Sequence, residues 1–132
     1  MIAVDSSALG AIIFKEPERP ALYRALLSDD NLLISSATVI EIRMVAHGRG
    51  GSQLVQELDD LIESLGLKIV PLGIEEIEIA HAAFVTYGKG NGHPARLNFG
   101  DLFSYALAKS RGVPLLFKGD DFGLTDVEVA GA

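Results

Sequence analysis

The side chains of this chain best suited to chemistry are carboxylates at the expected ends of strands and near the starts of helices. They are Asp5, Glu41, Asp101, Asp120 and Asp121. Asp5 follows the apolar run 2–4, and Asp120 and Asp121 follow the run 115–118. In a parallel sheet these positions lie at the carboxyl edge, where the sites of α/β proteins form. Asp101 opens a helical pattern, and Glu41 lies among mostly apolar helical neighbours, where an acid is unusual without a partner.

Carboxylates gathered at one sheet edge would favour metal-assisted chemistry. They repel one another, so protons or cations must compensate their charge. Hard carboxylate oxygens suit Mg²⁺ or Mn²⁺, and such an ion can activate a bound water to attack a phosphodiester. The chain has no cysteine, no GxSxG or HExxH motif, and no Lys-Ser/Thr ending of a phosphate loop. Metal-activated water is therefore the chemistry that the residues favour.

Each acid also has an ordinary structural interpretation, and spacing alone leaves both open. Asp5 could cap the helix that follows it. Asp101 could be a cap or a partner of the helix dipole. Asp120 and Asp121 could be turn residues after a glycine, and Glu41 could be an exposed surface residue. A metal site requires that these side chains meet at one edge.

The elements that would position the acids alternate between strands and helices. Near-continuous apolar runs predict buried strands at 2–4, 32–35, 68–71 and 115–118, with a weaker run at 127–129. Helical spacing of apolar residues predicts helices in the regions 20–28, 37–47, 54–65, 74–85 and 102–107. The GRGGS stretch predicts a hinge, and His81, on a helical stripe, is predicted to be a hydrogen-bonded core residue. The alternation predicts a single α/β domain over 1–132 with a mainly parallel sheet.

Composition narrows the class of protein further. The chain has 132 residues and a net charge of −7, which argues against whole-surface binding of nucleic acid but leaves room for a local basic strip. The opening segment has no basic region, and Asp5 interrupts its apolar run, so we expect neither a signal peptide nor a membrane span. The absence of cysteine fits a reducing compartment, and we expect the cytoplasm.

Three segments carry a resemblance to a known family. They are IAVDSSALGAIIF, SSATVIEIRMVAHGRG and YGKGNGHPARLNFGDLFSYALAKSRGVPLLFKGDDFGLTD. In their order and separation they resemble the PIN-domain ribonucleases, most closely the VapC toxins of type II toxin–antitoxin systems. The resemblance covers essentially the whole chain. It implies a three-layer α/β/α domain with an acidic pocket for Mg²⁺ or Mn²⁺.

The resemblance assigns roles to individual residues. The expected catalytic and metal-binding set is Asp5, Glu41, Asp101 and Asp121. Asp120 is the alternative to Asp121, because Gly119 stands where many PIN sequences carry an acid. The hydroxyls of Ser6 and Ser104 are expected to position ligands or water. Two members of the set, the first and third acids, would hold the metal, and the other two would orient or deprotonate the water or bind a second ion.

The implied reaction is endonucleolytic cleavage of structured RNA such as tRNA, which would inhibit translation. Because metal-activated water attacks, rather than the ribose 2′-hydroxyl, the products should carry 5′-phosphate and 3′-hydroxyl ends. Local cations are expected to line the RNA entry groove. They are Arg43, Lys89, Arg96 and Lys118.

The resemblance also implies partners. A VapB-type antitoxin would lay a basic segment across the acidic pocket, and the chain would form a homodimer and touch DNA only through the antitoxin. An apolar groove for the antitoxin could be offered by Ala8, Leu9, Ile12, Ile13, Leu22, Tyr23 and Leu26, whose alternative place is the core. A catalytically silent PIN-like binding module is the main rival. Receiver-type and haloacid-dehalogenase-like domains are disfavoured, because the first strand offers only the single acid of Asp-Ser-Ser.

Overall fold

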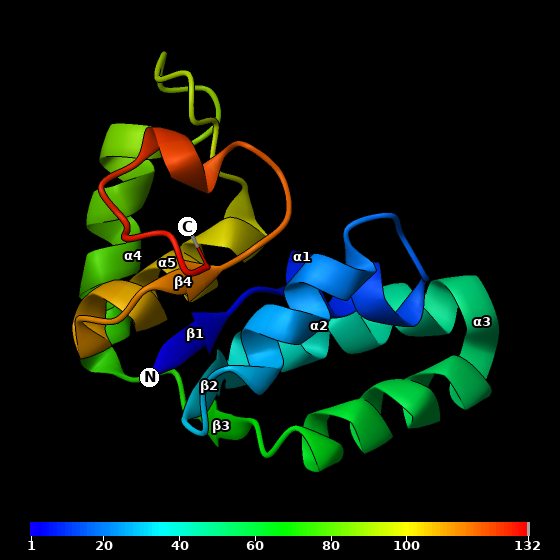
Figure 1. The fold of residues 1–132 in the computed structure, drawn as a ribbon. Coiled ribbons are helices and arrows are strands. Elements are labelled where there is room, and N and C mark those ends of the chain that lie inside the picture. Colours follow the sequence, from blue (N-terminus) through cyan, green and yellow to red (C-terminus); the bar gives the residue numbers. More distant parts are fainter. Residues whose placement is uncertain (132) are drawn as a thin grey trace.

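Four short apolar strands pair in parallel to form the sheet at the centre of the molecule (Figure 1). They are β1 (Ile2–Val4), β2 (Leu32–Ser35), β3 (Lys68–Val70) and β4 (Leu115–Leu116), in the order β3-β2-β1-β4. Ala3 of β1 pairs with Leu33 on one side and Leu115 on the other. The four predicted strands are confirmed, although β4 is only two residues long. The weak run at 127–129 contributes an isolated bridge from Val129 to Leu115.

The computed structural model describes residues 1–131, and within them five α-helices surround the sheet. They are α1 (Ser6–Ile13), α2 (Arg19–Leu27), α3 (Ser36–Ser64), α4 (Ile74–Tyr87) and α5 (Phe99–Arg111), followed by a short 3₁₀ helix, η1 (Phe122–Leu124). The predicted hinge is a kink in α3 at Gly51, whose φ of +67° suits glycine. None of the helices in residues 1–131 combines the length and the apolarity needed to cross a membrane.

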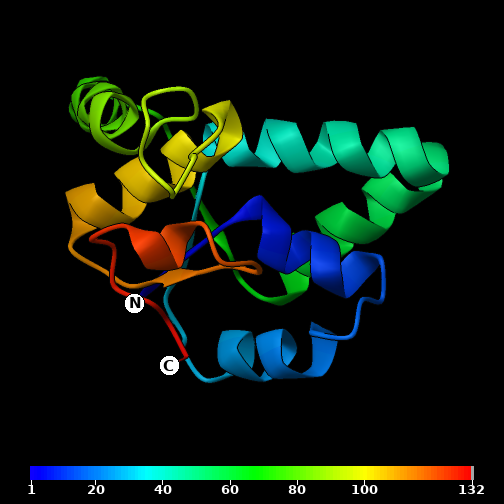
Figure 2. The ribbon, with the colours of Figure 1, turned by 90° about the horizontal axis from the view of Figure 1, so that it is seen from above.

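The helices cover both faces of the sheet, which gives the expected three layers (Figures 1 and 2). Ile2 and Val4 pack with apolar residues of α1, α2 and α3 on one face. Ala3 and Leu33 pack with α4, α5 and the segment after β4 on the other face. Because successive strand residues point to opposite faces, the short central strand β1 supplies both cores. Because all four strands run parallel, their carboxyl ends lie at the same edge of the sheet.

The prediction that His81 is a core residue is wrong. His81 is exposed on α4, and its neighbours on the predicted stripe, Ile74, Ile77 and Phe84, are exposed as well. Helix α4 buries a different face, which includes Ala83. The apolar periodicity of this helix therefore marks a surface and not the core.

The predicted apolar groove on the first two helices is also absent as an open surface. Ala8, Leu9, Ile12, Leu22 and Leu26 are buried in the core. The remaining two members, Ile13 and Tyr23, are half-buried against that core. The alternative interpretation holds, because α1 and α2 need these side chains to cover the sheet.

Candidate active site

Asp5 lies at the junction of β1 and α1 and is held on both carboxylate oxygens. The residue is only 2% exposed. Its Oδ2 accepts hydrogen bonds from the Ser7 backbone N–H, at 3.1 Å, and from the Ser7 hydroxyl, at 2.7 Å. Its Oδ1 accepts one from the hydroxyl of Ser104, which lies 99 residues later on α5. Asp5 therefore caps α1, as the structural interpretation requires, and also faces the other acids at the sheet edge.

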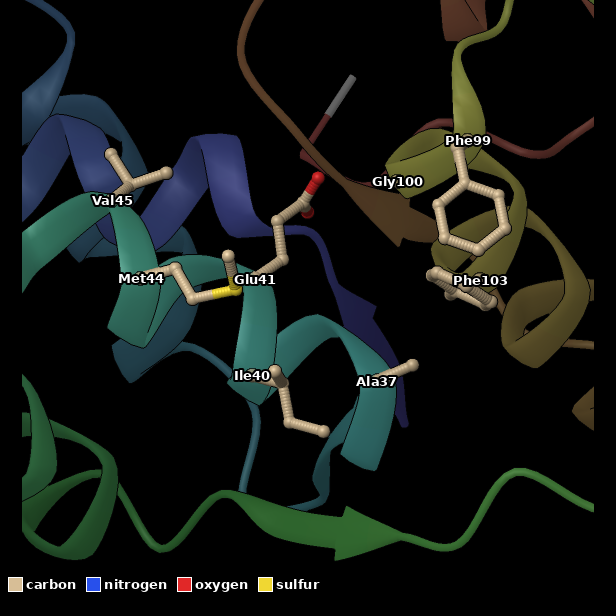
Figure 3. Close-up of a pocket in the computed structure, with 8 residues that line it drawn as sticks. All are labelled: Ala37, Ile40, Glu41, Met44, Val45, Phe99, Gly100 and Phe103. Atoms are coloured by element: carbon tan, nitrogen blue, oxygen red, sulfur yellow. The ribbon is translucent and has the colours of Figure 1, made fainter.

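Glu41 projects from α3 toward the first turn of α5 (Figure 3). Its Oε1 is buried and has no hydrogen-bond partner among the described residues. Burial raises the pKa of the Glu41 carboxyl and the charge of Asp5 adds to the rise, while the Ser6 hydroxyl opposes it. An unpartnered buried oxygen is costly, so this atom is suited to a ligand that satisfies it.

The approach of Glu41 to α5 depends on Gly100. A Cβ atom at position 100 would lie 1.7 Å from Glu41 Oε2 and 2.5 Å from Glu41 Cδ. Glycine in a helix costs roughly 1 kcal/mol relative to alanine, yet here it lies in the first turn of α5. We infer that the missing side chain makes room for the carboxylate. Sequence reasoning did not identify Gly100, and its signal was the glycine between Phe99 and Asp101 at a helix start.

Asp101 is fixed by a capping box at the start of α5. Its Oδ2 accepts from the Asn98 backbone N–H at 2.9 Å, and its own N–H donates to Asn98 Oδ1 at 2.9 Å. Burial raises the pKa of Asp101 to about 6, and the charges of Asp5, Asp121 and Glu41 add to the rise, while the Asn98 N–H opposes it. The Asp101 side chain, which completes the capping box begun by Asn98, is thus within electrostatic reach of all three other predicted acids.

The electrostatics of Asp101 favour Asp121 over Asp120 as the fourth acid. Both are exposed in the turn after β4. Gly119 precedes them in this turn and has a φ of +107°. Asp121, at the start of η1, raises the pKa of Asp101. Asp120 is not among the groups that do so. The sheet edge therefore collects four carboxylates, three of them on or beside helix starts.

The donor set suits a hard divalent cation, although the side chains are not drawn together around one point. Within residues 1–131, no three acidic or histidine side chains are arranged closely enough to hold a metal ion as they stand. The site nevertheless offers carboxylate oxygens alone, which Mg²⁺ and Mn²⁺ prefer. It also contains Glu41 Oε1, which has no hydrogen-bond partner among the described residues, and Asp101, whose pKa is raised. A cation would offset both unfavourable features.

The four cations predicted to contact RNA differ in their surroundings. Arg43 pairs with Asp59 at 3.0 Å, and Lys118 pairs with Glu16 at 2.9 Å. Lys89 and Arg96 lie in the exposed loop before α5 and take part in none of the ion pairs found within residues 1–131. Arg96 has a φ of +51°, in the left-handed region. The loop cations are therefore free to meet an anion without breaking an existing pair.

An apolar surface borders the acids on the side of α3, α4 and α5. A cavity of about 450 Å³ lies between α3 and α5, next to Glu41, and exposed Ile40, Met44 and Phe99 line it (Figure 3). A second cavity of about 310 Å³, lined by Ile77 and Phe84 among others, shares Phe99 with the first. We call this surface the α3–α5 apolar face. Exposed apolar patches of this kind mark interaction sites.

The elevated pKa of Asp101 predicts how the metal-free protein responds to pH. Between the ordinary value of 3.8 and about 6, folded Asp101 keeps a proton that the unfolded chain loses. This residue's contribution to stability therefore falls as the pH rises through that window. In EDTA, Asp101→Asn should melt at a higher temperature than wild type at pH 7, and the difference should shrink toward pH 4. Thermal melts followed by circular dichroism test this, with the exposed Asp30→Asn as control. An Asp101→Asn variant that melts below wild type at pH 7 would contradict it.

Comparison with known proteins identifies the family. The PIN domain family model matches residues 2–128. Two curated relatives from Mycobacterium tuberculosis each align over 127 residues: Ribonuclease VapC42 is 38% identical, covering 96% of this chain and 97% of the relative, and Ribonuclease VapC28 is 41% identical, covering 96% of both.

Solved structures share the fold at low sequence identity. M. tuberculosis VapC20, described as a Sarcin-Ricin loop cleaving toxin, has a TM-score of 0.78 at 18% identity, with 96% of each chain covered. VapBC2 from Rickettsia felis, bound to a promoter DNA fragment, has a TM-score of 0.74 at 16% identity, covering 98% of this chain and 96% of the other. With its four acids at the carboxyl edge of a parallel sheet, this chain belongs to the VapC family of PIN-domain proteins.

Proposed function

We propose that this protein is a Mg²⁺- or Mn²⁺-dependent endoribonuclease toxin of a VapBC module. It acts in the cytoplasm, cleaves structured RNA such as tRNA, and so inhibits translation. The observation that carries the proposal is the gathering of Asp5, Glu41 and Asp101 at one sheet edge with Glu41 Oε1 buried and unpartnered. The curated relatives named VapC ribonucleases support the RNA substrate.

Each residue of the site has a definite task in this reaction. Asp5, fixed by Ser7 and Ser104, and Asp101, fixed by Asn98, are the ligands for the ion. When bound, the ion supplies Lewis acidity and lowers the pKa of the attacking water. Glu41 Oε1, which is buried and has no hydrogen-bond partner among the described residues, would accept the proton of that water. Asp121 completes the acidic site from the turn after β4. The water oxygen bonds to phosphorus as the P–O3′ bond breaks, and the leaving 3′ oxygen takes a proton from solvent, which gives a 5′-phosphate and a 3′-hydroxyl end.

Cleavage of an unfractionated tRNA pool tests the proposal. Purified protein, free of antitoxin and shown to be folded by circular dichroism, is incubated with Mg²⁺ or Mn²⁺ and, in parallel, with EDTA. We expect discrete fragments only with metal, carrying 5′-phosphate and 3′-hydroxyl ends. Cleavage in EDTA or 2′,3′-cyclic phosphate ends would exclude this mechanism. If folded protein cleaves no RNA and calorimetry detects no Mg²⁺ binding, the silent binding module becomes the better description.

We further propose a VapB-type antitoxin as the protein partner. Structural relatives include a toxin–antitoxin complex from Klebsiella pneumoniae and the R. felis complex on promoter DNA. An Arg of the antitoxin would pair with the acids at the sheet edge. Contact with DNA would come through the antitoxin.

A homodimer formed through the α3–α5 apolar face completes the proposal. Ile77 of this face is 52% exposed, and burial of such side chains favours association. Ile77→Lys should halve the mass measured by light scattering. Leu27→Lys changes an equally large, 65% exposed side chain on α2, which covers the other side of the sheet, and should leave the mass unchanged. A monomeric wild type, or a dimer in both variants, would place the interface elsewhere or exclude it.

A further inference from the structure

A third cavity adjoins the acidic site between α1 and α3, and its lining is more polar than that of the α3–α5 apolar face. It has a volume of about 270 Å³. The lining residues that matter here are Ser6, Ser7, Phe14, Glu16, Arg49 and Lys118. We call this cavity the α1–α3 recess. It contains two cations, whereas the cavities of the apolar face contain none.

The recess is continuous with the acidic site through two serines. Ser7 donates to Asp5 and accepts, at 2.9 Å, a hydrogen bond from the backbone N–H of Lys118. Ser6 lies next to it and acts on the pKa of Glu41. A chain that places one group against Asp5 and Glu41 would therefore place a neighbouring group in the recess.

Arg49 lines the recess and lies over the ring of Phe14. Its guanidinium carbon lies 4.1 Å from the centroid of the Phe14 ring. Arg49 belongs to none of the ion pairs within residues 1–131. Stacking on an aromatic ring occupies the face of the guanidinium and leaves its edge donors available. Those donors match the geometry of a phosphate group.

The second cation of the recess is partly compensated. Lys118 Nζ lies 2.9 Å from Glu16 Oε2 and 3.7 Å from Glu18 Oε1. An incoming phosphate would have to compete with these carboxylates for Lys118. Arg49 is therefore the stronger anion contact of the two, and Glu16 limits what Lys118 can add.

We propose that the α1–α3 recess binds a backbone phosphate of the RNA next to the bond that is cleaved, with Arg49 as its principal contact. The proposal rests on the proposed ribonuclease function and deepens it. The recess, with its cations, suits a polyanion. The neighbouring α3–α5 apolar face suits a protein surface. RNA and a protein partner would therefore bind on different sides of the acidic site.

Salt dependence of RNA binding by Arg49→Gln tests the proposal. Binding of fluorescently labelled, unfractionated tRNA is followed by anisotropy in EDTA over a series of KCl concentrations. Loss of one phosphate contact should reduce the slope of log K against log salt by about 0.7–0.9. The Kd at low salt should rise about fivefold or more, and with Mg²⁺ present the KM should rise while kcat stays unchanged. Arg24→Gln, an exposed arginine on α2, is the matched control and should behave as wild type.

Two further variants separate the parts of the recess. Phe14→Leu keeps the charge but removes the stacking platform, so the Kd should rise less than with Arg49→Gln and the salt slope should be retained. Glu16→Gln removes the competing carboxylate and should lower the Kd. An unchanged Kd in Glu16→Gln would remove Lys118 from the RNA path.

The outcomes distinguish failure of this inference from failure of the proposed function. If wild type cleaves RNA with metal and Arg49→Gln has the salt slope and KM of wild type, the recess is not on the RNA path and the function stands. If folded wild type neither binds nor cleaves RNA, both are overturned. A reduced slope in Arg49→Gln but not in Arg24→Gln supports the recess.

Discussion

Asp5→Asn is expected to abolish RNA cleavage while leaving the fold intact. Asparagine caps helices as well as aspartate does, so its side-chain oxygen can still accept the Ser7 hydrogen bond that starts α1. The variant loses the negative charge and one of the two acceptor oxygens that Ser7 and Ser104 now hold in place. Because changes even to the partners of metal ligands cost 10–100-fold, loss of the ligand itself should lower kcat by at least ~100-fold.

The measurement pairs cleavage of the tRNA pool with metal binding. Calorimetry should detect Mg²⁺ or Mn²⁺ binding to wild type and to Asp30→Asn, a control that removes one exposed acid before β2. Binding should be lost in Asp5→Asn, whose melting temperature should stay close to that of wild type. Cleavage at the wild-type rate by Asp5→Asn would show that Asp5 only caps its helix.

Gly100→Ala should remove activity without removing stability. A methyl group at position 100 would occupy the space of the Glu41 carboxylate, 1.7 Å from Oε2. Glu41 is a flexible side chain, so it can swing away into the cavity beside it and the backbone need not move. Alanine also favours the helix by roughly 1 kcal/mol over glycine. We expect cleavage to fall ~10–100-fold, by analogy with the loss of a ligand's supporting partner, at an unchanged or higher melting temperature.

Two comparisons make the test of Gly100 specific. Gly48→Ala places a methyl group on α3 where nothing lies within 4 Å, so it should keep full activity. If Gly100 acts only by making room for Glu41, the double variant Gly100→Ala with Glu41→Gln should be no less active than Glu41→Gln alone. Additive losses would show that the glycine serves some other purpose, such as the approach of substrate to α5.

Local patterns were sufficient to predict the frame of the site. The runs at 2–4 and 32–35 are strands with the predicted bounds, and the acids that follow strands converge because parallel strands end at one edge. The structural and functional interpretations of Asp5 and Asp101 also proved compatible. Asp5 is the N-cap of α1 and Asp101 completes the capping box of α5, and both lie in the same acidic cluster. Stabilising a helix start and belonging to the acidic cluster are therefore not mutually exclusive for these two residues.

Features that depend on distant residues were not visible in the sequence. Lys118 pairs with Glu16, 102 residues away, so its neutralisation could not be inferred from its neighbours. The stripe containing His81 has core-like periodicity, but periodicity does not say whether a face meets the sheet or the solvent. The close approach of Gly100 to Glu41 joins α5 to α3. Each of these features depends on how distant elements pack together in three dimensions, which local sequence patterns do not show.

The hydrogen bond from Ser104 to Asp5 has a consequence for how the protein is made. The two residues are 99 positions apart, and β4, which pairs with β1, comes only at residues 115–116. A ribosome making this chain has therefore translated nearly all of it before the acids can meet. A nascent or prematurely terminated chain has Asp5 and Glu41 but no assembled site. The acidic site therefore assembles only when the chain is nearly complete.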